Sequence, residues 1–296
     1  MKKCLFASLF SHLFFTSLCA HATPSESISS FDNTYKEACV KIANDPWYFE
    51  HFRSLDAYTH IVETGGGKEF ADYLWAHASK TIWNKFSIFE KLDHIGAPVK
   101  TSYPGIGMFS ATTLRYIVIA QQMEHLFTLP DHPTVVEIGA GFGGQCYILS
   151  QLVSFSHYYI YDLPEVSLVI DKVLTALCVN NATCLPLDQN ITEENIDLVI
   201  SNYAFSECTR ETQLDYFNRV IKKSLRGYMI YNQIASSVFG LDSLSPQEFV
   251  SLLKQSGKNP KIYQEPVQTY PGNLLIVWDT TTKTDSYETN NTNHNK

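Results

Sequence analysis

The chain has 296 residues, 45% of them hydrophobic, which is enough to bury a full core in one large domain or in one domain with an extension. Its formal net charge is −8 and it contains no basic run, so the composition argues against sequence-independent binding to DNA or RNA. The 17 tyrosines and 18 phenylalanines predict aromatic side chains in the core and in the walls of any pocket.

Residues 1–22 have the pattern of a secretory signal peptide. Lys2 and Lys3 supply a positive end, an apolar stretch follows, and Ala20-His21-Ala22 offers small residues around a cleavage point. The apolar stretch is short and is interrupted by polar residues, so we expect no stable membrane span. An ordinary buried first helix is the alternative interpretation.

Residues 23–130 are predicted to form a helical N-terminal cap. Apolar and aromatic residues recur at helical spacing in three pieces, around Tyr35–Ile42, Phe70–Phe89 and Ala111–Phe127. Glycine-containing segments at 65–67 and 103–107 are predicted to be loops between these pieces. We expect a cap and not an independent domain, because the apolar faces of the pieces need a partner surface.

Residues 131–279 alternate between apolar strand-like and helix-like segments, which is typical of an α/β fold with a parallel sheet. The predicted strands are 135–138, 158–161, a short strand ending near 187–188, 196–200, 227–232, 261–264 and 274–278. The predicted helices are 145–153, 165–177, 209–223 and one that starts after Ser245 with a capping box to Glu248. Residues 280–296 are rich in Thr and Asn and are predicted to be a disordered tail.

The most informative run is VVEIGAGFGG, residues 135–144. Two β-branched residues and an isoleucine followed by glycines predict a buried parallel strand that turns sharply into a helix. Glycine allows a positive φ there and lets a ligand approach the backbone. Asp162, at the end of the next predicted strand, completes the outline of a nucleotide-type pocket at the carboxyl edge of an open sheet.

The glycines alone do not identify the ligand, because Gly139, Gly141 and Gly144 also satisfy the dinucleotide pattern G-x-G-x-x-G. Glu137 favours a different cofactor. Its carboxylate would repel a pyrophosphate, whereas S-adenosylmethionine carries an ammonium, a sulfonium and a ribose diol and has no phosphate. We therefore expect S-adenosylmethionine in preference to NAD, and a glycine turn without a ligand is the third interpretation.

Four blocks of the chain resemble class I S-adenosylmethionine-dependent methyltransferases, and more narrowly the family of sugar O-methyltransferases. They are VVEIGAGFGGQ (135–145), YDLPEV (161–166), ISNYAFSE (200–207) and RGYMIYNQ (226–233). The resemblance implies a Rossmann-like, seven-stranded sheet, S-adenosylmethionine as cofactor, and a small-molecule or glycan acceptor that is methylated on a sugar hydroxyl. A signal peptide departs from this family, because the cofactor is made in the cytosol, so the location stays open between export and cytoplasm.

The resemblance also implies which residues hold the cofactor. Glu137 would face its ammonium, and Asp162 would accept both ribose hydroxyls in a bidentate contact. Asp188 would reach the adenine amino group, although Asp162 and Asp188 could each be simple turn residues. The full set of expected cofactor-binding residues is Glu137, Gly139, Ala140, Gly141, Gly143, Asp162, Leu163, Asp188 and Asn202.

On the acceptor side, Tyr203 and Arg210 are expected to meet the substrate, and Glu207 is the candidate general base. Glu207 could instead be a helix N-terminal acid, and Arg210 could pair with Glu207 or lie on the surface. Arg115 could meet the cofactor carboxylate from the cap. If the base is a histidine, it has to come from the cap: His51, His60, His77, His94 or His125.

The sequence offers no Asp/His cluster with metal-ligand spacing, and its cysteines show no paired pattern, so neither a metal nor a disulfide framework is expected. Two other classes of function remain open. An NAD-dependent oxidoreductase would use Asp162 to bind the NAD ribose, and an exported, non-catalytic relative would keep the fold without binding a cofactor.

Overall fold

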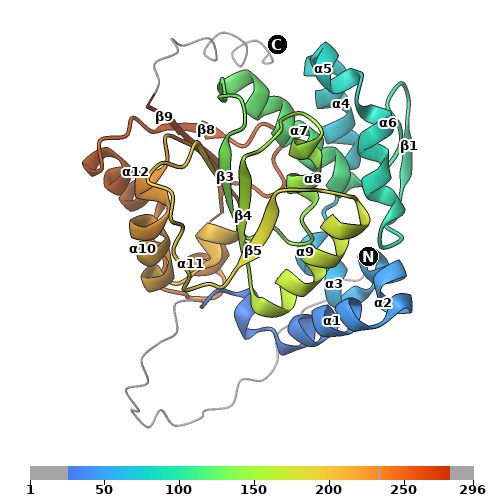
Figure 1. Cartoon of the computed structure of the whole chain (residues 1–296), viewed down its shortest axis with the longest axis horizontal. Coiled ribbons are helices and arrows are strands. Elements are labelled where there is room, and N and C mark those ends of the chain that lie inside the picture. The colour runs from blue at the N-terminus through green and yellow to red at the C-terminus, as the bar shows by residue number, and fades with distance from the viewer. Residues whose placement is uncertain (1–25, 233, 281–296) are drawn as a thin grey trace.

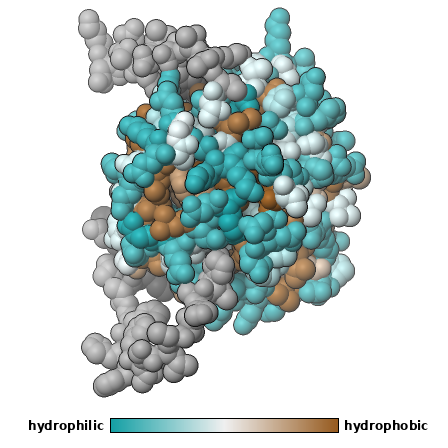
Figure 2. Space-filling view, turned by 60° about the vertical axis from the view of Figure 1, so that its left-hand side comes forward, coloured by the Kyte–Doolittle hydropathy of each residue, from teal (hydrophilic) through white to brown (hydrophobic). Residues whose placement is uncertain are grey.

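The computed structural model describes residues 26–232 and 234–280 (Figure 1). The predicted signal peptide and residues 281–296 of the predicted tail lie outside the described residues. In the part that the structure describes, no helix is both long enough and apolar enough to cross a membrane. On the face shown in Figure 2, hydrophilic residues cover most of the surface and hydrophobic residues gather in patches between them.

The centre of the fold is a seven-stranded sheet in the order β5-β4-β3-β6-β7-β9-β8. Its strands are β3 (Thr134–Ile138), β4 (His157–Tyr161), β5 (Ala182–Leu185), β6 (Leu198–Asn202), β7 (Arg226–Tyr231), β8 (Lys261–Gln264) and β9 (Leu274–Asp279). All neighbours are parallel except β9, which is antiparallel to β7 and to β8. The predicted α/β fold, with a seven-stranded sheet that ends in an antiparallel pair, is confirmed.

The strand order reverses at β3, because β4 and β5 continue on one side of it while β6 and β7 continue on the other. In open α/β sheets, ligands bind at such a switch point, outside the carboxyl ends of the strands. The carboxyl ends of β3, β4 and β6 are therefore the place where a site is expected.

Helices cover both faces of the sheet, and successive residues of a strand point to opposite cores. Val135 belongs to the core shared with the N-terminal helices, and Val136 to the other core. The first face carries α7 (Ala111–Leu126), α8 (Gly144–Ser150) and α9 (Pro164–Ala176), and the second carries α10 (Arg210–Arg219) and α12 (Pro246–Gln255). The expected capping box of Ser245 with Glu248 starts α12.

The N-terminal region is built from short helices that extend the first core. They are η1 (Ser29–Phe31), α1 (Asn33–Asn44), α2 (Pro46–His51), η2 (Phe52–Ser54), α3 (Asp56–Val62), α4 (Gly67–His77), α5 (Lys80–Trp83), α6 (Phe86–Phe89) and η3 (Glu90–His94). Their buried side chains belong to the same apolar cluster as the residues of α7, α8 and the sheet, so this region and the sheet share one core. In Figure 1, α1 lies against α9.

Several predicted boundaries were wrong for local reasons. The helix predicted over 70–89 is divided into α4, α5 and α6, because Ser79 caps a new helix by accepting a hydrogen bond from the Ile82 amide. The loop predicted at 103–107 is confirmed as the turn of a hairpin, but its two strands, β1 (Thr101–Tyr103) and β2 (Gly107–Phe109), were not predicted. The helix predicted over 209–223 stops at Arg219 and is followed by η5 (Ile221–Lys223), and α11 (Ile234–Ser237) was not predicted.

A buried arginine joins the N-terminal region to the turn after β3. Arg53, only 1% exposed, donates to Asp93 Oδ1 at 2.9 Å and to Ser110 Oγ at 2.8 Å, and it is ion-paired with Glu63. Its guanidinium also lies 4.6 Å from the ring centroid of Phe142, which belongs to the glycine turn. A buried charge is tolerated only where its hydrogen bonds are satisfied, and here both carboxylates and the hydroxyl satisfy them.

We expect Arg53→Met to lower the free energy of unfolding by about 3–5 kcal/mol, because it leaves the Asp93 carboxylate buried without its cation. Urea unfolding followed by circular dichroism measures this loss. Arg210→Met is the control: Arg210 is a partly exposed arginine with two carboxylate partners, and its loss is expected to cost about 1 kcal/mol or less. Equal costs for the two variants would contradict the role given to Arg53.

Candidate functional site

The turn between β3 and α8 is built on glycines with positive φ: 75° at Gly139, 62° at Gly141 and 82° at Gly143. A Cβ added to Gly139 would lie 2.0 Å from the Ala204 Cβ, so both the backbone conformation and the packing require glycine there. A Cβ at Gly143 would meet the Leu174 side chain of α9 at 3.1 Å. The sequence suggested close approach of a ligand, and the structure adds close approach of the protein's own helices.

Asp162 follows β4 directly and ties this turn to the next one. Its Oδ2 accepts hydrogen bonds from the amides of Ala140 (2.8 Å) and Gly141 (3.1 Å), and its Oδ1 accepts one from the Leu163 amide (2.8 Å). Burial raises the pKa of Asp162 to about 6, although the three amides oppose this effect. An ionised carboxylate has about four lone-pair sites, and the three amides use three of them, so one acceptor site remains for a ribose hydroxyl. The bidentate contact with both hydroxyls stays a prediction.

A pocket of about 50 Å³ lies at the carboxyl ends of β3, β4 and β6. It brings together four of the predicted site residues, Gly139, Asp162, Leu163 and Glu207. The remaining lining residues were not predicted: Ser27, Ser29, Ile138, Tyr161, Leu187, Ala204, Cys208, Thr212 and Tyr216. Ile138, Tyr161 and Ala204 lie inside the sequence motifs described above. The serines at 27 and 29 and the α10 residues lie outside these motifs, and only the fold brings them to the pocket.

Glu137 does not line this pocket. It is 1% exposed inside β3 and accepts a hydrogen bond from the Tyr158 hydroxyl at 2.8 Å. Burial raises the pKa of Glu137 to about 8, while the tyrosine bond opposes this rise. At neutral pH this carboxyl is therefore largely protonated, and its contact with a cofactor ammonium stays a prediction.

Asn202 and Arg115, near the turn, contain buried atoms without a hydrogen-bond partner among the described residues: both Nδ2 and Oδ1 of Asn202, and Nε of Arg115. Gln145, directly after the turn, has such an atom in its Oε1. The Arg115 guanidinium lies 5.5 Å from the ring centroid of Tyr203, the residue after Asn202. Buried polar atoms are normally satisfied, because leaving one unpaired costs about 1–3 kcal/mol. Asn202 and Arg115 are therefore suited to receive polar groups of a ligand.

Tyr203 occupies a backbone conformation that is rare for its type, with a φ of 75°. Its hydroxyl donates to Glu265 Oε1, and Glu265 also accepts from the Thr269 amide and the Asn273 side chain, each at 2.9 Å. The loop between β8 and β9 thus fixes Tyr203 from outside the predicted motif. Strain of this kind is concentrated at functional sites.

Glu207 is the last residue of η4 (Ala204–Glu207) and accepts a hydrogen bond from Asn232 Nδ2 at 2.6 Å. Burial raises the pKa of Glu207 above its ordinary value. Arg210 does not pair with it. Arg210 donates to Asp242 and Glu248, each at 2.9 Å, in a partly exposed position. The predicted pair of Arg210 with Glu207 was therefore wrong, and the contact of Arg210 with the substrate stays a prediction.

The predicted position of Asp188 at a strand end was wrong, because β5 already ends at Leu185. Asp188 is exposed in the turn that follows, and its neighbour Leu187 lines the pocket, so the contact of Asp188 with the adenine stays a prediction. The histidines considered as alternative bases are absent from the pocket lining, and all of them are exposed or partly exposed: His51, His60, His77, His94 and His125. Within the described ranges, no group of three His, Cys, Asp or Glu side chains could hold a metal ion.

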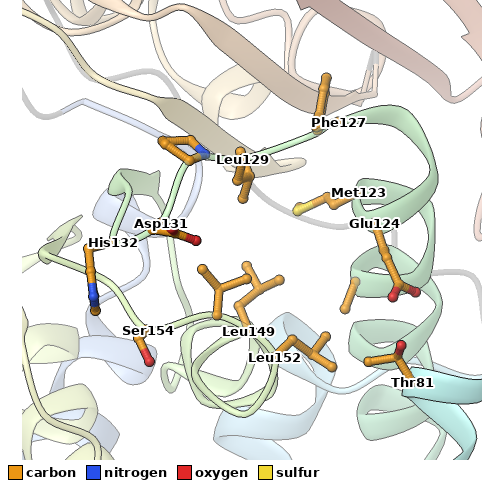
Figure 3. Close-up of a pocket in the computed structure, with 13 residues that line it drawn as sticks. Thr81, Met123, Glu124, Phe127, Leu129, Asp131, His132, Leu149, Leu152 and Ser154 are labelled. Atoms are coloured by element: carbon orange, nitrogen blue, oxygen red, sulfur yellow. The ribbon is translucent and has the colours of Figure 1, made fainter.

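A larger pocket of about 590 Å³ lies at the other edge of the sheet, beside the segment that leads from α7 into β3 (Figure 3). Leu149 and Leu152 lie between His132 on one side and Glu124 on the other. None of the predicted site residues lines this pocket. Its position at the amino end of β3 separates it from the switch point.

No protein-family model and no curated protein sequence matches the chain. Among solved structures, it is similar to an S-adenosylmethionine-dependent methyltransferase from Aquifex aeolicus, with 18% identity over 53% of this chain and 87% of that chain and a TM-score of 0.42. Geranyl diphosphate C-methyltransferase from Streptomyces coelicolor, in complex with S-adenosyl-L-homocysteine, is 14% identical over 57% and 81%, with a TM-score of 0.45. A methyltransferase from Mesorhizobium loti is 13% identical over 53% and 95%, with a TM-score of 0.41.

The raised pKa of Glu137 predicts a pH-dependent stability. Between pH 4.5 and about 8 the folded state holds the Glu137 proton more tightly than the unfolded state, so stability falls as pH rises through this window. Glu137→Gln keeps an acceptor for Tyr158 and removes the buried charge. We expect Glu137→Gln to have a higher free energy of unfolding than the wild type. This difference should be at least about 1.4 kcal/mol larger at pH 8.5 than at pH 5.

Urea unfolding at the two pH values measures this difference, with the exposed Glu50→Gln as a control that is expected to show none. A Glu137→Gln effect of the same size at both pH values would show that the carboxyl is ionised throughout the window.

Proposed function

We propose that the protein is an S-adenosylmethionine-dependent O-methyltransferase that methylates a hydroxyl of a sugar or glycan unit. The observation that carries the proposal is the contact of Asp162 with the positive-φ glycine turn at the switch point of the sheet, in one pocket with Glu207. The sugar as acceptor is supported by the resemblance of residues 161–166 and 200–207 to sugar O-methyltransferases.

The residues beside the turn suit the methionine end of this cofactor. Burial raises the pKa of the Tyr116 hydroxyl. Arg115 lowers this pKa and Glu137 raises it, so both groups lie close enough to Tyr116 to influence it. An α-amino acid carries an ammonium and a carboxylate on one carbon. The Arg115 guanidinium, 5.3 Å from the ring centroid of Tyr116, would bind the carboxylate, and the Glu137 carboxyl would accept a hydrogen bond from the ammonium. Arg115 Nε and Asn202 offer unused hydrogen-bonding atoms.

Asp162, Leu163 and Leu187 would hold the nucleoside end, since they line the pocket next to the turn. Asp162 offers its remaining acceptor site to a ribose hydroxyl, and the two leucines offer an apolar surface for the adenine. When bound, S-adenosylmethionine supplies the methyl group on a positively charged sulfur.

Glu207 is suited to the proton transfer. It would accept the proton that the acceptor hydroxyl loses as its oxygen bonds to the methyl carbon, and Asn232 holds its carboxylate in place. The raised pKa of Glu207 brings the group closer to neutral pH, where a general base works best. The other contribution of the protein is alignment, because positioning of the two reactants removes much of the barrier.

We expect Glu207→Gln to lower methyl transfer by about 10²–10⁴-fold, because the amide cannot take up the proton. Its affinity for S-adenosylhomocysteine should stay within about threefold of the wild type, because the amide keeps the shape of the side chain and an oxygen for Asn232. The measurements are transfer of a radiolabelled methyl group to a panel of free sugars and glycosides, and calorimetric titration with S-adenosylhomocysteine.

Glu211→Gln, at an exposed acid in the first turn of α10, is the matched control and should transfer at the wild-type rate. Full activity of Glu207→Gln would exclude Glu207 as the base. Transfer to no sugar, with cofactor affinity intact, would remove the sugar assignment and keep the methyltransferase.

A further inference from the structure

The first described residues of the chain run across the carboxyl edge of the sheet and pair with the segment after β6. Ser27 forms an antiparallel bridge with Cys208. On either side of this bridge, the Ile28 amide donates to the Glu207 carbonyl at 3.1 Å and the Thr209 amide donates to the Glu26 carbonyl at 2.8 Å. The segment is therefore attached to the same residues that carry the candidate base.

On its other side, the segment continues through η1 into α1, which packs against α9 (Figure 1). Because α9 follows β4 and Cys208 follows β6, residues 26–31 connect the two sides of the crevice at the switch point. Ser27 and Ser29 line the pocket there, together with Gly139, Asp162 and Glu207.

The pocket under this segment is too small for a nucleoside-containing cofactor. Its volume is about 50 Å³, whereas pockets for small molecules usually measure about 300–1,000 Å³. A cofactor that uses Asp162 therefore needs residues 26–31 to move.

The attachment of residues 26–31 is weak enough to permit this movement. The η1 turn buries none of its residues, and Phe31 is 60% exposed, whereas α1 buries four side chains and is capped by Asp32. Segments with few buried contacts open at low free-energy cost. The chain is therefore firmly packed from Asp32 onward, whereas residues 26–31 are held mainly by backbone hydrogen bonds.

We propose that residues 26–31 form a strap that closes the cofactor site and has to leave its bridge with Cys208 before S-adenosylmethionine can reach Asp162. The proposal rests on the proposed function for the identity of the cofactor. The strap would then control how fast the cofactor enters.

The bridge between Ser27 and Cys208 allows a direct test. The two flanking hydrogen bonds make it a non-hydrogen-bonded antiparallel pair, in which the Cα atoms are about 4.5 Å apart. This distance is within the range that a disulfide spans. Ser27→Cys in the full chain can therefore be oxidised onto Cys208, which locks the strap closed, and dithiothreitol releases it.

We expect oxidised Ser27→Cys to bind S-adenosylhomocysteine at least about tenfold more slowly than the reduced variant, and reduction to restore the rate. Loading with S-adenosylhomocysteine before oxidation should slow formation of the disulfide at least about tenfold, because the bound ligand keeps the strap away from Cys208. A ligand that binds elsewhere would leave the rate of disulfide formation unchanged, and this result would contradict the strap. The wild-type protein, treated with the same oxidant, is the control.

Ile28→Pro tests the strap without a cross-link. The φ of Ile28 is −52°, which proline accepts, and the substitution removes the amide that donates to Glu207. We expect the association rate to rise by about threefold to tenfold, the equivalent of one hydrogen bond, because the closed strap loses a contact. Ile28→Ala keeps the amide and should show the wild-type rates.

Surface plasmon resonance on the immobilised protein measures the binding rates. Unchanged rates in both Ile28→Pro and oxidised Ser27→Cys would overturn the strap and leave the proposed function intact. A wild-type protein that does not bind S-adenosylhomocysteine would overturn both.

Discussion

The contact between the Asp162 carboxylate and the amides of Ala140 and Gly141 is the interaction on which the candidate site depends. It joins the turns after β3 and β4, at the point where the order of the strands reverses. The positive φ values of the glycines turn the amides toward the carboxylate, and Arg53 supports the same turn from the cap through Phe142. The turn is thus fixed from both sides before any ligand binds, and preorganisation of this kind favours binding.

The residues at this edge of the sheet also favour S-adenosylmethionine over NAD. A dinucleotide site needs free amides and a positive helix end for its pyrophosphate. Here Asp162 already occupies two of the amides, and Glu137 lies buried below the turn. A cofactor without a phosphate does not need the amides that Asp162 occupies, and Arg115 and Asn202 offer it buried polar atoms that have no partner among the described residues.

The sheet, the glycine turn and the position of Asp162 could be predicted from the sequence because each has a local signal: a β-branched run, glycines in series, and an acid after a strand. Asp188 was wrongly predicted to lie at the end of a strand, because the apolar residues continue to Leu187 whereas β5 ends at Leu185. The contact of Tyr203 with Glu265 and the bridge of Ser27 with Cys208 join residues far apart in the chain. No periodicity or motif indicates such pairs, and only the packed fold brings them together.

The most direct test of the account is calorimetric titration of the protein with S-adenosylhomocysteine and, separately, with NAD, for the wild type and for Asp162→Ala. The account predicts micromolar binding of S-adenosylhomocysteine alone, and a loss of at least about tenfold in affinity in the variant, which removes a charged hydrogen-bond acceptor. Binding of NAD in preference, or of neither ligand, would contradict it. Wild-type affinity in Asp162→Ala would show that the cofactor, if bound, lies elsewhere.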